Sequence, residues 1–503
     1  MTMTKVLTRC CGGTISQLIT IELDISRGLP SFTIIGLSSV RAHAVRARVR
    51  SAIINSGYQF PAKKITLSLS FDDAIIEATG YELPIAIAIL IASRQIHPLN
   101  SEKYEFYAGL SLDGSLNGCK GTISSILGAL EAKHTIIVAS ALYAPELTLQ
   151  GCEVFYAQNL KQVCQFLEDG IQHLPTFHQC PPESPPLASP DLQNIVGQYY
   201  PKRALEVAAA GGHSLLMIGP PGTGKTSLAH CLPGLLPELT EQEKVEIAQI
   251  ANLQTHHLVR PLKRPFRIPH HSITMAGLIG SSHPVALGEI TLAHHGILFL
   301  DELLEFNKKI LEGLRTPLEV GHVLLSRAKK QVIFPAKFQL IAAMNLPFTY
   351  GLSKPQAYSP QSLKNSSLDH LSAAMIDRFQ LSIEVTTCFD NHNGLMSESS
   401  QTVKQRVVLA RERQLARQGK ENALLSANEV RHYCELTACD GNWLRCCLEK
   451  LGLSHRVYLH ICRVARTITD LQGETGITRA SLKEALSYRY GDRIIQYLTR
   501  LHQ

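Results

Sequence analysis

Apolar and polar residues recur with two different periods over the first 170 residues, which indicates both strands and helices there. Strands are predicted at 31–37 and 65–70, the second of them because apolar and polar residues alternate. Helices are predicted at 41–57 and 83–93. We therefore expect the first 170 residues to form an α+β domain.

Apolar runs after residue 190 follow a second pattern. A helix is predicted at 200–210 and a buried strand at 214–218, and two further short apolar runs lie at 297–300 and 339–343. Helical stretches separate these runs, and such alternation is typical of a parallel sheet covered by helices. The sequence therefore predicts an α/β core.

Composition places the boundaries between domains. Six prolines lie between residues 175 and 190, where neither a helix nor a central strand can form, so a linker is predicted there. From about residue 401 an arginine-rich amphipathic pattern dominates and strand signals disappear, which predicts a helical domain. The predicted division is an α+β domain at 1–174, a linker at 175–190, the α/β core at 191–386, a linker at 387–400 and the helical domain at 401–503.

The overall composition is that of a folded protein. Hydrophobic residues make up 45% and charged residues 18% of the 503 residues, which excludes a disordered chain, and the formal net charge of +7 permits a polyanionic partner without requiring one. The 13 cysteines are scattered, which favours reduced thiols over a disulfide framework. The most apolar run, 83–92, is too short to cross a bilayer, which takes about 20 residues. We expect a soluble cytoplasmic protein without a membrane anchor.

A phosphate-binding motif follows the predicted strand at 214–218 and precedes a helical stretch. The sequence fits G-x-x-x-x-G-K-[ST], in which the glycines let backbone N–H groups turn toward a phosphate. We expect Lys225 to reach the β- and γ-phosphate oxygens of ATP and Thr226 to supply a hydroxyl to Mg²⁺. The alternative is a glycine-rich turn without a ligand. The predicted nucleotide-binding residues of this motif are Gly219, Pro220, Pro221, Gly222, Thr223, Gly224, Lys225, Thr226 and Ser227.

Two carboxylates follow the apolar run at 297–300. Asp301 is expected to hold Mg²⁺ together with Thr226, and Glu302 to polarise the water that attacks the γ-phosphate. Taken alone, an Asp-Glu pair after a strand more often caps a helix. Its combination with the phosphate loop favours ATP hydrolysis over nucleotide binding alone.

Two further polar residues lie at predicted strand ends. Asn345 comes just after the run at 339–343, and Arg378 comes before a strand-like segment at 381–385. Asn345 could simply cap a turn, and Arg378 could form a surface ion pair with Asp377. The order of phosphate loop, acidic strand end, polar strand end and arginine matches that of ring-forming ATPases, in which the arginine reaches a neighbour's γ-phosphate.

Residues 322–334 form two apolar arms around a basic tip, which predicts a β-hairpin. Its tip residues Arg327, Lys329 and Lys330 are candidates for salt-sensitive contacts with DNA phosphates, and the alternative is a hairpin whose tip charges are only solvated. A second segment, 272–285, has a small apolar tip at 276–280 that is a candidate contact with substrate or a neighbouring subunit.

Longer segments carry a resemblance over nearly the full length. The chain resembles the ComM/YifB family of bacterial AAA+ proteins, which are magnesium-chelatase-like. The segments that carry the resemblance are 28–37, 55–65, 80–86, 202–213, 266–272, 288–294 and 463–468.

This resemblance implies an N-terminal domain with a Lon-protease/ribosomal-S5-like fold, an AAA+ P-loop core and a C-terminal helical lid. It implies a hexameric, ATP- and Mg²⁺-dependent DNA translocase or helicase that promotes branch migration during natural transformation. By motif, it makes Asn345 the sensor 1 residue, Arg378 the trans arginine finger and Arg456 the sensor 2 candidate, with Arg463 as the other candidate for sensor 2.

Two other functions compete with this one. An ATP-dependent motor that remodels a protein partner, as in magnesium insertion into a tetrapyrrole, would need no basic pore hairpin. A Lon-like protease would need a nucleophile, and residues 80–88 contain no serine.

Relatives usually carry closely spaced cysteines after sensor 1, but residues 346–351 contain none, so no zinc role is expected for that loop.

Overall fold

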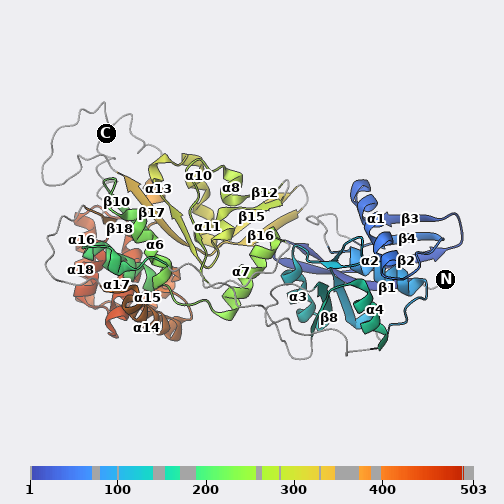
Figure 1. Ribbon diagram of the computed structural model, residues 1–503. Helices are drawn as coiled ribbons and strands as arrows, with labels where there is room; N and C mark the ends of the chain where they lie inside the picture. The colour runs from blue at the N-terminus through green and yellow to red at the C-terminus, as the bar shows by residue number, and fades with distance from the viewer. Residues whose placement is uncertain are drawn as a thin grey trace.

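The computed structural model describes residues 3–70, 80–98, 101–139, 153–169, 189–255, 263–282, 285–327, 330–345, 373–386, 398–489 and 491. These residues form two large sheets and a group of helices. Figure 1 shows the first sheet at one end of an elongated molecule, the second sheet in the middle and the C-terminal helices at the other end.

The first sheet has seven strands in the order β3-β4-β2-β1-β5-β8-β9. The long antiparallel pair β1–β2 forms its centre, and β5, β8 and β9 continue it as parallel strands. The strands, including the small separate pair β6–β7, are β1 Thr4–Gly12, β2 Ile15–Ser26, β3 Ser31–Ile35, β4 Lys64–Leu69, β5 Tyr104–Tyr107, β6 Gly109–Leu110, β7 Leu116–Asn117, β8 Thr135–Ala139 and β9 Val154–Ala157.

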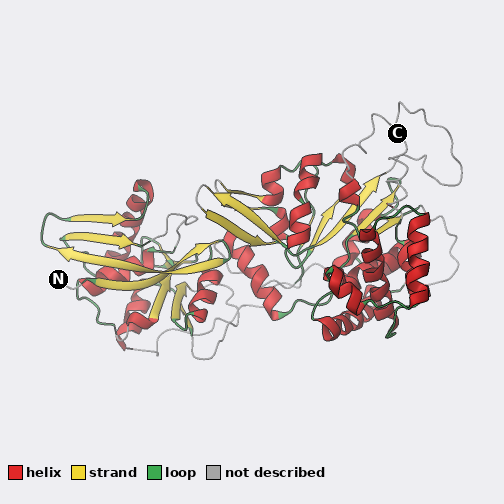
Figure 2. Ribbon diagram, turned by 180° about the vertical axis from the view of Figure 1, so that it is seen from behind, coloured by secondary structure: helices red, strands yellow, loops and turns green. Residues whose placement is uncertain are grey.

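Four helices pack with this sheet (Figure 2): α1 Ser39–Asn55, α2 Glu82–Ala92, α3 Thr122–Glu131 and α4 Leu160–Asp169. Helix α2 is apolar around its whole circumference and is buried along most of its length, as such a helix must be. One charge lies inside the sheet: Glu105 is fully buried and accepts hydrogen bonds from Arg9, with 3.0 Å between Nη2 and Oε1. That pairing offsets the cost of removing both charges from water.

The second sheet has five strands, all parallel, in the order β11-β14-β17-β10-β18. Strands β10 and β14 are buried at every position, which is expected when helices cover both faces of a parallel sheet. The five strands are β11 Phe266–Arg267, β14 Ile297–Leu300, β17 Gln339–Asn345, β10 Leu215–Gly219 and β18 Leu381–Glu384.

Helices and two hairpins surround the second sheet. The helices are α5 Tyr199–Gly211, α6 Lys225–Leu235, α7 Glu241–Gln254, α8 Met275–Ile279, α9 Glu289–Leu292, α10 Lys308–Gly313, α11 Arg315–Val320 and α13 Ala373–Ile376. The hairpin strands are β12 Gly280–Ser282 with β13 Val285–Leu287, and β15 His322–Arg327 with β16 Lys330–Pro335.

The C-terminal region is helical, and serine or threonine side chains cap its helices at their N-termini. Apolar side chains of its longest helices share one core with the second sheet, for example Val407 and Ile461 with Leu215. The helices are α14 Ser400–Gln418, α15 Ala427–Tyr433, α16 Ala438–Lys450, α17 His455–Gln472 and α18 Arg479–Ser487.

The predicted elements agree with the observed ones to within two residues at almost every end. The strand predicted at 297–300 has those bounds, and the hairpin predicted at 322–334 is present. The segment 276–280, predicted as a small apolar tip, lies in helix α8 and at its end; Leu278 is fully buried while Ala276 and Gly277 are exposed, and its contact with substrate or a neighbouring subunit stays a prediction. The small apolar residues there let α8 pack closely, since a side chain at Gly277 would meet Ile273.

Helix α7 joins the two sheets. Asn252 is fully buried. Its Oδ1 accepts a hydrogen bond from the backbone N–H of Ile123 at 3.1 Å, and its Nδ2 donates one to the carbonyl of Cys119 at 3.3 Å. Gln249, one turn earlier, donates to the carbonyl of Thr14 at 2.6 Å. The N-terminal sheet is therefore fixed to the second sheet by satisfied buried polar groups.

A buried histidine joins the second sheet to the C-terminal helices. His213 is fully buried, and its two ring nitrogens lie 2.6 Å from Oε1 of Gln380 and 2.7 Å from Oγ1 of Thr467. Burial lowers the pKa of His213 to about 3.

We expect this histidine to make stability depend on pH. Between a pH of about 6.5 and a pH of about 3, the unfolded chain binds a proton at His213 that the folded chain does not. The free energy of unfolding therefore falls as the pH falls through this range, by up to about 1.4 kcal/mol per pH unit. Urea denaturation between pH 7 and pH 5 should show a shallower pH slope for His213→Asn than for wild type. The matched control is His432→Asn on the exposed part of α15, and equal slopes for His213→Asn and wild type would contradict the account.

Candidate nucleotide site

Three of the predicted site segments meet at one edge of the second sheet. Because β10, β14 and β17 are parallel neighbours, their carboxyl ends lie together. The register pairs Gly219 with Asn345, and Asp301 directly follows the last residue of β14. Asn345 is the last residue of β17 rather than the residue after it. The carboxyl edge of an open α/β sheet is the usual place for a ligand.

The phosphate loop spans 219–224, and Lys225, Thr226 and Ser227 form the first turn of α6. Gly222 and Gly224 have φ values of +78° and +85°, a left-handed conformation that glycine adopts without strain. An added Cβ at either glycine would meet nothing within 4 Å, so the loop is open on that side. Successive backbone N–H groups in such a loop form a concavity for anions at a helix N-terminus.

The Lys225 side chain lies inside this loop. Its ammonium group donates to the carbonyls of Gly219 at 3.0 Å and Pro220 at 2.7 Å. Burial lowers the pKa of Lys225, and the Asp301 carboxylate opposes that effect. The lysine is thus held among loop atoms, at the position from which a phosphate-binding lysine acts.

Thr226 and Asp301 are in contact across the gap between α6 and β14. The Thr226 hydroxyl donates to Oδ2 of Asp301 at 2.9 Å. A hydroxyl and a carboxylate at this separation are the oxygen ligands that Mg²⁺ takes from protein beside a nucleotide. The residues present therefore fit ATP with Mg²⁺.

Glu302 has a strained backbone. Its φ of +54° lies in the left-handed region, which a glutamate adopts only where the surrounding structure enforces it. Its side chain is 53% exposed at the mouth of the site. Strain of this kind often occurs where a side chain must be aimed at a ligand.

The structure brings one further residue, His271, to this site. Nδ1 of His271 lies 4.0 Å from Oε2 of Glu302, and the His271 ring packs against that of His270 at an interplanar angle of 35°. His271 follows β11, and Glu302 follows the neighbouring β14, so only the pairing of these strands shows that they meet. No spacing in the sequence could have identified the pair.

Arg378 lies at the opposite edge of the sheet. It precedes β18, and its backbone carbonyl accepts from the Ser214 hydroxyl at 2.8 Å, at the amino end of β10. Strand β10 separates this point from the phosphate loop by roughly 13 Å, at about 3.3 Å per residue. The side chain of Arg378 forms an ion pair with Glu319. The alternative that Arg378 pairs with Asp377 was therefore wrong.

Arg456 lies beside Arg378. Its Nη2 is 3.7 Å from Oε1 of Glu319, the same carboxylate oxygen that contacts Arg378. The two arginines of predicted catalytic function thus share one cluster, away from the phosphate loop of their own chain. Arg463 donates to the carbonyl of Leu425 at 2.5 Å and is partly buried, so it ties a helix to a loop rather than being a solvated charge.

The hairpin β15–β16 carries the predicted DNA-binding residues. Arg327 and Lys330 are the last register pair before its tip. Lys329 and the side chains of Arg327 and Lys330 lie outside the described residues. Gly13 of the first sheet packs against the hairpin, where an added Cβ would lie 2.8 Å from Val332. The hairpin therefore contacts the N-terminal sheet through its apolar face.

A second cluster of metal-ligand type joins α7 to the turn before β14. One ligand atom each of Glu246, His294 and His295 lies within 4.8 Å of the others. The backbone N–H of Lys337 donates to Nδ1 of His294 at 3.0 Å, so neutral His294 carries its proton on Nε2, 3.0 Å from Glu246. A protonated ring nitrogen has no lone pair for a metal, so we assign this cluster as a hydrogen-bonded clamp.

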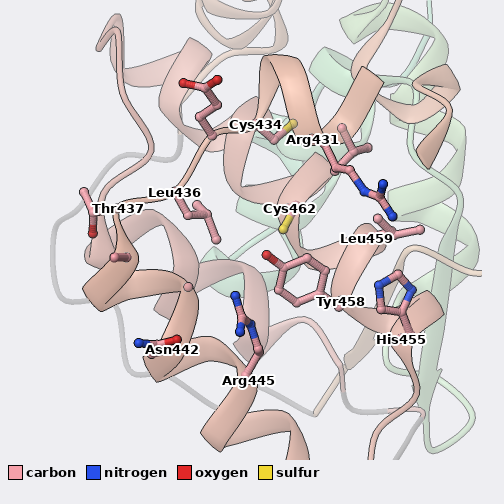
Figure 3. Close-up of a pocket in the computed structure, with 14 residues that line it drawn as sticks. Arg431, Cys434, Leu436, Thr437, Asn442, Arg445, His455, Tyr458, Leu459 and Cys462 are labelled. Carbon is pink, nitrogen blue, oxygen red and sulfur yellow. The ribbon is translucent and has the colours of Figure 1, made fainter. Parts of the chain in front are cut away.

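A cavity of about 370 Å³ opens among the C-terminal helices (Figure 3). Arg445, His455 and Tyr458 lie at it, and it contains the thiols of Cys434 and Cys462. Burial raises the pKa of both thiols to about 12, so both stay protonated at neutral pH. All lining residues lie between 430 and 462, so the cavity is separate from the phosphate loop.

Comparisons with known proteins match this arrangement over its length. The family model for magnesium chelatase subunit ChlI matches residues 191–392, and related models match residues 21–141 (subunit ChlI of Mg-chelatase) and 397–489 (subunit ChlI, C-terminal). The uncharacterized protein YifB of Salmonella typhimurium is 44% identical over 510 residues, which is 100% of both chains. The chain belongs to the ComM/YifB family of magnesium-chelatase-like proteins.

Two other members of this family are similarly close. The uncharacterized protein YifB of Escherichia coli is 43% identical, and the competence protein ComM of Haemophilus influenzae is 42% identical, each over 511 residues and 100% of both chains. Membership in the family confirms the predicted α/β fold with an AAA+ core and helical C-terminal region. No helix in the described part of this family member has the length and apolar character needed to cross a membrane.

The backbone strain at Glu302 generates a stability prediction. Glu302→Gly should raise the free energy of unfolding by about 1 kcal/mol, because glycine adopts positive φ without the steric cost, whereas Glu302→Gln keeps its Cβ and should change it by less than about 0.5 kcal/mol. Urea denaturation measures both. The control is Glu305→Gly, in the neighbouring turn without positive φ, which should be destabilising by about 0.5–1 kcal/mol. A Glu302→Gly variant less stable than wild type would show that the backbone is not strained.

Proposed function

We propose that this chain is a Mg²⁺-dependent ATPase that works as a ring, in which each ATP is bound by one subunit and completed by the arginines of the next. The observation that carries the proposal is the placement of Arg378 and Arg456 at the sheet edge opposite the phosphate loop. Within one chain, the length of strand β10 lies between the backbone of Arg378 and the phosphate loop, and Arg456 shares the carboxylate that Arg378 contacts. A neighbouring copy, offset around a ring, can bring these arginines to the nucleotide.

Within this site, the described residues divide the work. Backbone N–H groups of the phosphate loop, from residues other than Pro220 and Pro221, and the Lys225 ammonium would hold the phosphates. Thr226 with Asp301 would hold Mg²⁺, which neutralises charge on the phosphate oxygens when bound. Glu302 polarises the attacking water, and Nδ1 of His271 lies 4.0 Å from its carboxylate. Asn345, in register with Gly219, is placed to orient that water or the γ-phosphate.

We further propose that ring ATPase activity drives translocation or branch migration of DNA. Support comes from the basic tip of β15–β16, Arg327, Lys329 and Lys330, and from the 42% identity to a relative named as a competence protein. Basic side chains that line a ring would contact DNA phosphates without reading sequence. The competing function is a motor that remodels a protein partner, which the magnesium chelatase family models favour.

ATP hydrolysis with and without forked DNA separates the two functions. We expect DNA to stimulate the wild-type rate several-fold, and Lys329→Ala/Lys330→Ala to lose that stimulation while keeping its basal rate, because the phosphate contacts are lost and the nucleotide site is intact. The matched control is Lys308→Ala/Lys309→Ala, an exposed lysine pair on α10 that should keep the stimulation. The rate of Lys225→Ala, which lacks the phosphate-binding lysine, gives the background hydrolysis without nucleotide binding. Wild-type hydrolysis that DNA leaves unchanged would favour the protein-remodelling motor.

A further inference from the structure

Glu319 binds the two arginines that the proposed ring mechanism requires. It lies near the end of α11, and one of its oxygens, Oε1, contacts Nη1 of Arg378 and lies 3.7 Å from Nη2 of Arg456. Arg315, one turn earlier on the same helix, adds a third positive charge near Glu319 and Arg456. Glu319 thus contacts two guanidinium groups and lies near a third.

The cluster has more positive charge than its acidic residues offset. Three arginines face two carboxylates, Glu319 and the nearby Asp377. The hydrogen bond from Arg378 lowers the pKa of Glu319, so this carboxylate stays ionised. The surplus cation charge makes the cluster a site for a further anion.

Arg378 also has hydrogen-bonding capacity that this pairing does not use. Its side chain is only 8% exposed, and its Nε is buried without a hydrogen-bond partner among the described residues. A buried guanidinium with an unused donor is costly, and an acceptor with several oxygens would satisfy it better than a single carboxylate oxygen does.

Glu319 itself is free to leave. Its side chain is 54% exposed, whereas that of Arg378 is almost fully buried, so the carboxylate can rotate into water while the arginine stays in place. A nucleoside triphosphate carries more negative charge than a carboxylate and offers oxygens on several sides.

We infer that Glu319 is an intramolecular substitute for phosphate: in the free subunit it holds Arg378 and Arg456 in place, and the nucleotide of a second copy of this chain displaces it when the ring forms. This inference rests on the proposed ring ATPase. Glu319 is then a positioning residue whose contacts with the arginines compete with assembly. The surface around Arg315, Arg378 and Arg456 binds the edge of the neighbouring copy that carries ATP.

The test is ATP-dependent self-association, measured by sedimentation velocity with a slowly hydrolysed ATP analogue. Removing the competing charge in Glu319→Gln should lower the protein concentration for half-assembly by roughly three- to tenfold. Glu319→Asp, which keeps the charge, should reach half-assembly at a concentration close to that of wild type. The matched control is Glu312→Gln, an exposed glutamate on α10, which should assemble as wild type does.

A double mutant shows whether Glu319 acts through the arginine. In an Arg378→Ala background, Glu319→Gln should tighten assembly clearly less than it does in wild type, because only the longer contact of Glu319 with Arg456 is left to remove. If Glu319→Gln assembles at the wild-type concentration or a higher one, or tightens assembly equally in the Arg378→Ala background, the inference is wrong and the proposed function stands. If the nucleotide does not promote association of wild type at all, the ring ATPase proposal itself fails, and this inference with it.

Discussion

The parallel direction of five strands is the constraint on which the rest of this molecule depends. Parallel strands place all their carboxyl ends at one edge, so the phosphate loop, Asp301, Glu302 and Asn345 meet there although they are far apart in sequence. The same rule sends whatever precedes a strand to the other edge, and Arg378 precedes β18. In the proposed ring mechanism, one chain therefore carries the two halves of a shared site at opposite edges of this sheet, which is the arrangement a ring of identical copies can use.

Helix α7 couples this sheet to the rest of the chain. Along one helix, Glu246 holds the two histidines that precede β14, while Gln249 and Asn252 hold the N-terminal sheet. Asp301 and Glu302 directly follow β14, so the N-terminal region and the acidic end of the site are linked through a short path of buried and part-buried hydrogen bonds. The hairpin β15–β16 also touches the N-terminal sheet, at Gly13. Both contacts fix the N-terminal sheet to the region that carries the candidate nucleotide site.

Local motifs made much of this site predictable. The segment at 219–226 predicts a phosphate loop because its glycines, lysine and threonine lie within a few residues of one another. The apolar run followed by Asp301 and Glu302 predicts a strand that ends at two carboxylates. Contacts between distant residues were not predictable. The pairing of Arg378 with Glu319, the approach of His271 to Glu302 and the burial of Leu278 in α8 all depend on which strands and helices become neighbours. A single sequence specifies those neighbours only through the packing of the whole core.

The most direct test of shared sites is a mixture of two inactive subunits. Lys225→Ala subunits have Arg378 but lack the phosphate-binding lysine, and Arg378→Ala subunits have the lysine but lack the arginine. Each alone should hydrolyse ATP at less than about a tenth of the wild-type rate. If the site forms between copies, mixing the two should restore measurable hydrolysis, because an Arg378→Ala subunit then receives Arg378 from a Lys225→Ala neighbour. A mixture no more active than the average of its two components would contradict the account and place the whole site within one chain.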